Sequence, residues 1–184
     1  MRLSVLLLAV IASSVLLANL THATPPSPYS GQESRKVKAL STEDVQAYLA
    51  GKGMGFAKAA ELNGYPGPSH VLTLAADLGL TADQKQRTES LFSNMESTAI
   101  ALGRPLIEGE RKLDQMFAEK TVTPESLEQA LARIGELQAQ IRQAHLAAHL
   151  VQAEILTPAQ LSKYMILRGY TDTLRSKDHA AHKH

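Results

Sequence analysis

Two long amphipathic segments joined by a very short link constrain the fold of this chain more than any other feature. Within residues 82–119 apolar side chains recur about every 3.5 residues, and within residues 124–155 a second apolar seam runs from Leu127 to Ile155. Because only residues 120–122 separate these segments, the helices that they form must fold back on each other. The sequence therefore predicts a long antiparallel helical hairpin, with arms of about 50 Å at about 1.5 Å per residue.

Capping signals mark where the predicted helices begin. Thr81 is followed three residues later by Gln84, and Thr157 by Gln160. Each pair has the pattern of a capping box, in which the two side chains satisfy backbone amides that have no partner within the helix. Inside the first long segment, Pro105 predicts a kink, because proline removes one backbone hydrogen bond and clashes with the preceding turn.

Shorter helices are expected on both sides of the hairpin. Ser41 can cap a helix that ends near Gly51, and further apolar stretches cover residues 56–62, 68–78 and 158–169. Few β-branched and aromatic residues, with much Ala, Leu, Gln and Glu, favour helix over sheet. We expect an all-α chain, a long antiparallel hairpin with short flanking helices.

The first residues read as a secretory signal. Arg2 precedes an almost wholly apolar stretch, and Thr21 and Ala23 place small side chains where a signal peptidase cleaves. An uncleaved N-terminal anchor is the alternative, since the stretch is nearly long enough to span a membrane. An exported chain without cysteine suits the bacterial periplasm. The chain divides into a signal peptide (1–23), a flexible leader (24–40), a helical domain (41–170) and a polar, histidine-containing tail (171–184).

Composition excludes several classes of function. With no cysteine, the chain has no disulfide scaffold, no thiolate zinc site and no thiol catalysis. A formal net charge of +1 argues against binding of nucleic acid through its phosphates. The sequence shows no nucleotide-binding loop, no nucleophile elbow and no usefully spaced carboxylate pair, so we expect no enzymatic activity.

The two capping boxes also belong to a recurring motif, LTxxQ. Its copies are Leu80, Thr81 and Gln84, and then Leu156, Thr157 and Gln160. The motifs themselves read as caps without a function. Two copies bracketing a long helical hairpin in an exported chain resemble the Spy/CpxP-like family of periplasmic proteins. The resemblance covers roughly residues 68–170 and implies a curved, four-helix, usually dimeric protein. Members of this family bind heavy-metal ions as sensors or resistance proteins, or shelter unfolded envelope proteins without ATP.

Histidines offer the chemistry of a metal site. His145 and His149 are four residues apart, so they share one helix face and can clamp Zn²⁺, Ni²⁺, Co²⁺ or Cu²⁺. The alternative is a solvated pair beside the hairpin seam. The resemblance implies such a pair before the second LTxxQ, with further ligands from an N-terminal helix, and His70 is the candidate third ligand. Other residues near it are Glu61 and Asp77. His179, His182 and His184 form a separate, weaker candidate site in the tail.

Two functions remain open at this stage. The first is a non-enzymatic periplasmic metal-binding protein of the heavy-metal sensor or resistance type. The alternative is an ATP-independent periplasmic chaperone of the Spy/CpxP type in the envelope stress response. We expect a homodimer through the hairpin, because a single hairpin leaves apolar flanks exposed. Unfolded envelope proteins and a membrane signalling partner are the other candidate partners.

Overall fold

A computed structural model describes residues 27–170. Residues 1–26 and 171–184 lie outside this described part, and with them the predicted signal segment and His179, His182 and His184. Every regular element between residues 27 and 170 is a helix, which confirms the all-α prediction. The helices are α1 (Thr42–Leu49), α2 (Lys58–Glu61), α3 (Pro68–Thr73), α4 (Ala75–Leu78), α5 (Ala82–Ala118), α6 (Pro124–Ile155) and α7 (Pro158–Leu167).

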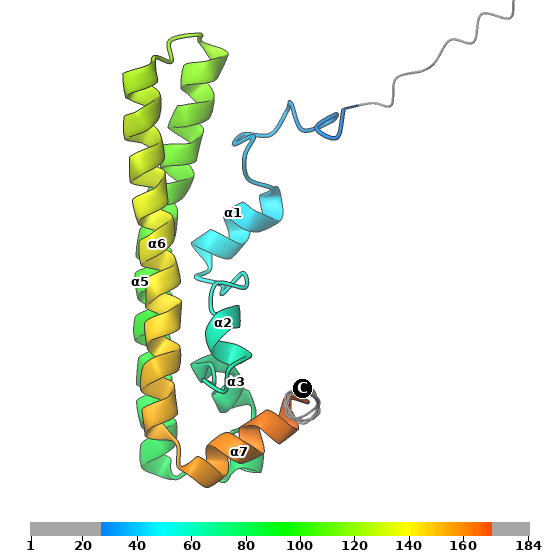
Figure 1. Cartoon of the computed structure of the whole chain (residues 1–184), viewed down its shortest axis with the longest axis vertical. Coiled ribbons are helices and arrows are strands. Elements are labelled where there is room, and N and C mark those ends of the chain that lie inside the picture. The colour runs from blue at the N-terminus through cyan, green and yellow to red at the C-terminus, as the bar shows by residue number, and fades with distance from the viewer. Residues whose placement is uncertain (1–26, 171–184) are drawn as a thin grey trace, which may run out of the picture. The chain divides into compact units, whose positions relative to one another are not determined.

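Helices α5 and α6 are the two longest described elements and lie side by side in opposite directions (Figure 1). Their bounds match the predicted segments to within one residue. The apolar seams meet in a core cluster formed by Leu106, Leu137 and Ile141, with Tyr48 of α1 packed against it. Helix α5 continues without interruption through Pro105, whose side chain is exposed to solvent.

Glycine lets α1 pack directly on the middle of α5. A Cβ atom at Gly103 would lie 2.6 Å from the carbonyl oxygen of Tyr48, closer than real Cβ contacts come. Any larger residue at position 103 would push the end of α1 away from the long helices. Residues 58–73 continue in α2 and α3 along the same side of the pair (Figure 1), where α2 contacts α6 and α3 contacts both long helices.

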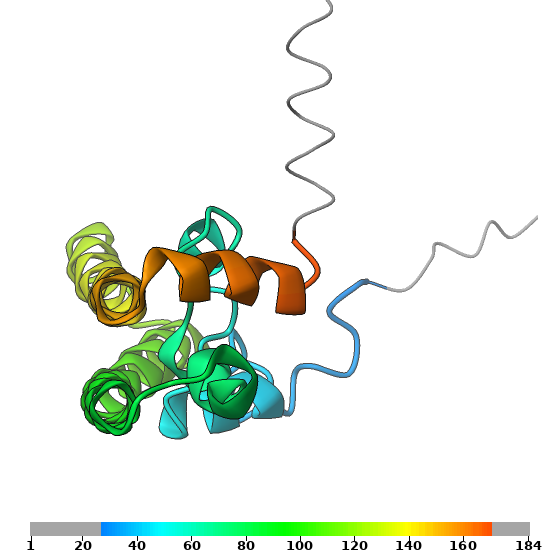
Figure 2. The ribbon, with the colours of Figure 1, turned by 90° about the horizontal axis from the view of Figure 1, so that it is seen from below.

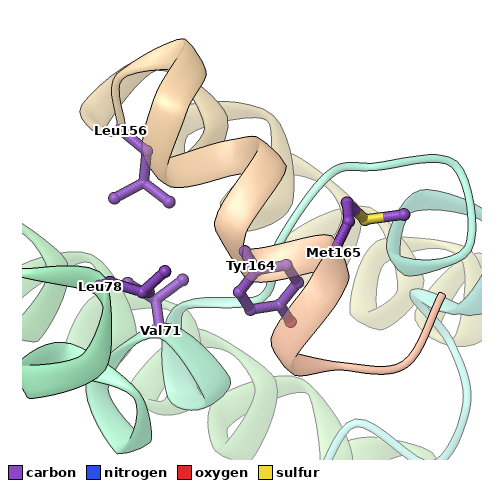
Figure 3. Packing of buried hydrophobic residues seen from close by; sticks show 5 residues of the cluster. All are labelled: Val71, Leu78, Leu156, Tyr164 and Met165. Atoms are coloured by element: carbon purple, nitrogen blue, oxygen red, sulfur yellow. The ribbon is translucent and has the colours of Figure 1, made fainter. Parts of the chain in front are cut away.

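A second cluster closes the end of the long helices at which α5 begins and α6 ends. It joins Val71 of α3, Leu78 of α4, Leu156, and Tyr164 and Met165 of α7 (Figure 3). Seen from below, α7 extends from the end of α6 beside the short N-terminal helices (Figure 2). The turn between α4 and α5 has Gly79 in the left-handed conformation, as expected for a helix C-terminus.

All the predicted N-caps form. The side chains of Ser41, Thr81 and Thr157 accept hydrogen bonds from the backbone amides three residues later. In each case the third residue returns a bond to the cap amide, so the capping boxes at Thr81 and Thr157 are confirmed. Helix α6 begins in the same way, with Thr123 as its N-cap. The helix starts are therefore fixed by local chemistry.

Part of the segment that composition assigns to a leader packs against the domain. Val37 is buried, Leu40 packs against the central core cluster, and Lys38 Nζ lies 3.0 Å from Asp114 Oδ2 of α5. Residues 27–31 belong to a separate unit and contain a turn, in which the Ser30 amide donates to the Ser27 carbonyl. Among the described helices, none has the length and apolar character needed to cross a membrane.

Candidate functional site

The two histidines of α6 are buried, which excludes the solvated alternative. His145 is 4% exposed and His149 is 8% exposed. Residues 51–67, the loops around α2, cover them. The Phe56 ring stacks on the His145 ring, with 5.9 Å between centroids and an interplanar angle of 22°. The four-residue spacing thus puts both imidazoles on the face of α6 that meets the N-terminal segment.

The position and tautomer of His149 are fixed by backbone contacts. Its Nδ1 lies 2.8 Å from the carbonyl oxygen of Tyr65. Since a carbonyl only accepts, Nδ1 carries a proton, and the neutral ring then has its lone pair on Nε2. A Cβ atom at Gly67 would lie 3.0 Å from Cε1 and Nε2 of the ring, so only glycine leaves the ring in this place without adjustment. Metal-binding histidines are oriented in this way by a partner on the other ring nitrogen.

His145 is held neutral and keeps an unpaired ring nitrogen. Burial, and then the neighbouring His149, lower the pKa of His145 below its ordinary value. Its Nε2 is buried and has no hydrogen-bond partner within residues 27–170. A Cβ atom added at Gly53 would lie 4.0 Å from its Nδ1. An unpaired buried polar atom costs about 1–3 kcal/mol, which a bound ligand can offset. Burial thus keeps His145 in the neutral form that metal binding needs.

Glu61, at the end of α2, links this histidine pair to α7. Its Oε1 accepts hydrogen bonds from the hydroxyls of Tyr164 (2.6 Å) and Tyr170 (3.2 Å) and from Nε of Arg168 (3.2 Å). Its Oε2 accepts from the Gly67 amide at 3.2 Å and lies 3.8 Å from Nδ1 of His149. The carboxylate thus holds the end of α7 against the wall of the histidine site.

These hydrogen bonds determine the charge of Glu61 and Tyr164. Burial alone would raise the pKa of Glu61, but the Tyr164 hydroxyl, the His70 imidazole, Tyr170 and Arg168 together hold that pKa below its ordinary value. Burial and the hydrogen bond to Glu61 raise the pKa of Tyr164. Glu61 is consequently a carboxylate, and Tyr164 a phenol that donates to it.

His70 lies on the other side of Glu61. Its Nδ1 is 3.4 Å from Glu61 Oε1 and 3.4 Å from the Tyr164 hydroxyl, and its side chain is 46% exposed. The predicted third ligand is therefore connected to His149 through a shared carboxylate. Within the described part of the chain, no three His, Asp or Glu side chains are already grouped as a metal site. Asp77 is exposed on α4 and is not among the residues that line the site.

A pocket of about 480 Å³ opens over the histidine pair. His70, His145, His149 and Glu61 all line it, so the structure brings the three predicted histidines of the domain to one cavity. Its other walls include the side chains of Met54, Phe92 and Met95. Glu61, which the sequence marks only as a residue near His70, thus lies in the same cavity as the histidine pair.

No protein-family model, no curated protein and no solved structure matches this chain.

The LTxxQ residues lie away from the histidines and contact each other. The side-chain amide of Gln84 donates to that of Gln160 at 2.8 Å, and the reverse bond is 3.0 Å. Gln84 also donates to the Ile155 carbonyl at 2.9 Å. Thr81 and Thr157 are helix caps. These residues tie the start of α5 to the start of α7 and do not line the pocket.

Proposed function

We propose that this chain is a non-enzymatic, periplasmic metal-binding protein of the heavy-metal sensor or resistance type. The observation that carries the proposal is the pair His145 and His149, two buried imidazoles one helical turn apart on the wall of a pocket. Buried histidines are ordinarily satisfied by protein partners. Here one ring has an unpaired nitrogen, and the other has its proton fixed on the nitrogen that faces Tyr65.

Each residue of the site has a distinct part in this proposal. His145 and His149 donate imidazole lone pairs to Zn²⁺, Ni²⁺, Co²⁺ or Cu²⁺. Tyr65 orients His149 through its carbonyl oxygen. Glu61 lines the same pocket, with Oε2 3.8 Å from Nδ1 of His149, and supports the wall beside the histidines. His70 is the candidate third ligand from within the described domain, and the tail histidines form a separate, weaker site.

An ATP-independent chaperone of the Spy/CpxP type is the second candidate. The observation that favours it is a set of large apolar side chains exposed on the long helices and on α7. They are Phe117, Leu131, Leu150, Val151, Ile166 and Leu167. Surfaces of this kind bind apolar segments of other chains. Suppression of client aggregation that is unchanged when His145 and His149 are replaced would support this candidate over the metal-binding one.

We further propose the family arrangement and assembly that the LTxxQ motifs imply: a four-helix, Spy/CpxP-like fold that dimerises through its long helices. The exposure of Leu150 (53%) and Val151 (43%) on α6 supports a partner on this face. Sedimentation of the exported form at micromolar concentration is expected to give the mass of a dimer. A compact monomer would contradict this proposal.

Calorimetric titration tests the metal proposal. The full chain, with His179, His182 and His184 all replaced by alanine, is titrated separately with Ni²⁺, Co²⁺, Cu²⁺ and Zn²⁺. We expect one ion per chain for at least one of these metals, and weaker binding at pH values below about 6.5, since protons compete with the metal for imidazole and the lowered pKa of His145 delays that competition. If none of the four ions binds to this variant, the metal-binding function is wrong.

A further inference from the structure

We propose that the pocket over His145 and His149 takes the metal as a complex with a small anionic chelator, and not as a bare hydrated ion. This inference rests on the proposed metal-binding function and names the ligand of the same site. It follows from three features of the pocket: an incomplete set of protein ligands, a volume too large for an ion, and walls suited to an organic molecule.

The protein supplies too few donors to complete a coordination sphere. Divalent transition metals take about four to six donor atoms. No group of three His, Asp or Glu side chains is assembled within residues 27–170. Glu61, the nearest carboxylate, already accepts hydrogen bonds from Tyr164, Tyr170, Arg168 and the Gly67 amide. Even with His70 as the third ligand, a metal with about six donor atoms keeps three positions for ligands that are not protein side chains.

The pocket has room for those ligands. A six-coordinate aqua ion occupies roughly 180 Å³, at about 30 Å³ per water. The pocket measures about 480 Å³, within the range of about 300–1,000 Å³ that is typical of sites for small organic molecules. The difference accommodates a chelator the size of an amino acid or a hydroxycarboxylic acid.

The walls fit the carbon skeleton and the charge of such a chelator. Apolar surface dominates the lining, with Met54, Phe92 and Met95 among the contributors. Two exposed lysines, Lys52 and Lys58, also line the pocket. Apolar walls are poor surroundings for a hydrated cation, whereas they pack against the methylene groups of an organic ligand.

The charged residues that line the pocket favour a ligand with carboxylate groups. The carboxylates that line the pocket are Glu61 and Glu96, and the charge of Glu61 is compensated by Arg168 at 3.2 Å. The ammonium groups of Lys52 and Lys58 therefore outnumber the one remaining carboxylate. We infer a chelator with two or more carboxylates, with its metal-binding groups toward the histidines and its free carboxylate toward the lysines.

Equilibrium dialysis with two labels tests this inference. The full chain carrying the alanine substitutions at His179, His182 and His184 is dialysed against labelled Ni²⁺, against labelled citrate, and against both together. We expect citrate to be retained only when nickel is present, in a ratio of one citrate per nickel, and nickel to be retained at least tenfold more tightly with citrate than without.

Matched variants locate the chelator. The double variant Lys52→Gln, Lys58→Gln is expected to lose at least tenfold in affinity for the nickel–citrate complex, with little change for nickel alone. Lys163→Gln is the control, because Lys163 is exposed on α7 and does not line the pocket. His145→Ala and His149→Ala are expected to abolish retention of both labels.

The outcomes separate this inference from the function on which it rests. If nickel binds alone and citrate only strips it from the protein, the chelate inference is wrong and the metal-binding function stands. If nickel is retained neither alone nor with citrate, the chelate inference is wrong, and the titration with the other three ions decides the metal-binding function. Retention of citrate without nickel would also overturn the inference, because the histidine pair would then bind an organic acid directly.

Discussion

Gln84 and Gln160 hydrogen-bond to each other through both ends of their side-chain amides, at 2.8 Å and 3.0 Å, although 76 residues separate them in the chain. Each also serves as the third residue of its own capping box. The LTxxQ motif thus does more than begin a helix. It ties the start of α5 to the start of α7 and closes the end of the molecule at which α6 ends.

Replacing Gln84 by alanine should therefore cost more stability than a simple capping residue does. The variant loses the capping bond, the amide pair with Gln160 and the bond to the Ile155 carbonyl, so we expect a loss of about 2–3 kcal/mol in the free energy of unfolding. Ser126→Ala is the matched control, since the Ser126 hydroxyl accepts from the Thr123 amide at the same capping position in α6, and its loss should cost about 1 kcal/mol. If urea denaturation gives the two variants equal losses in the free energy of unfolding, Gln84 has no role beyond capping.

Two glycine-to-alanine substitutions test how closely α1 approaches α5. Gly103→Ala should destabilise by about 1–3 kcal/mol, because the new methyl group would lie 2.6 Å from the Tyr48 carbonyl oxygen. Gly135→Ala is the matched control inside α6: nothing lies within 4 Å of the new Cβ, and alanine should stabilise the helix by about 0.5–1 kcal/mol. Thermal denaturation of both variants measures the two effects, and a stabilised Gly103→Ala variant would show that the contact is wrong.

Glu61 should connect the pocket to α7. Glu61→Gln keeps the shape of the side chain and removes its charge, so Arg168 and the two tyrosine hydroxyls lose a charged acceptor. We expect a loss of about 2–3 kcal/mol in the free energy of unfolding, and about 1–2 kcal/mol for Tyr164→Phe, which removes one donor only. If Glu61→Gln unfolds at the same urea concentration as the unsubstituted chain, this carboxylate does not hold α7.

The stability of the metal-free protein should depend on pH through His145. Burial lowers the pKa of His145 in the folded state, so the unfolded chain takes up this proton more readily. The contribution of His145 to the free energy of unfolding is therefore fully present above the unfolded pKa of about 6.5. It decreases as the pH drops below that value toward the lower pKa of the folded state. The free energy of unfolding, measured from pH 8 to pH 5.5, should fall less steeply for His145→Gln. Parallel profiles would contradict a neutral, buried His145.

The helices could be predicted from the sequence because their signals are local. Caps at Thr81 and Thr157 and the apolar seams of the long segments depend on residues three or four positions apart, which a sequence displays directly. The burial of His145 and His149 could not be predicted, because it depends on a glycine-rich segment from 51 to 67 folding over α6. The environment of Glu61 was equally hidden, since its donor Tyr164 is 103 residues away. The only signal for Glu61 in the sequence was local: it is an acidic residue between apolar neighbours, just before a turn.

The most direct test of the metal site is the loss of affinity in single-histidine variants. In the chain with alanine at His179, His182 and His184, we measure the affinity for the tightest-binding metal by calorimetry after replacing His145 or His149 by alanine. Gln138→Ala, at an exposed position of the same helix, is the control. We expect each histidine substitution to remove most of the affinity, by tenfold or more, because one imidazole cannot replace a two-point clamp, while Gln138→Ala leaves it unchanged. Affinity that survives both single substitutions would contradict the proposed function.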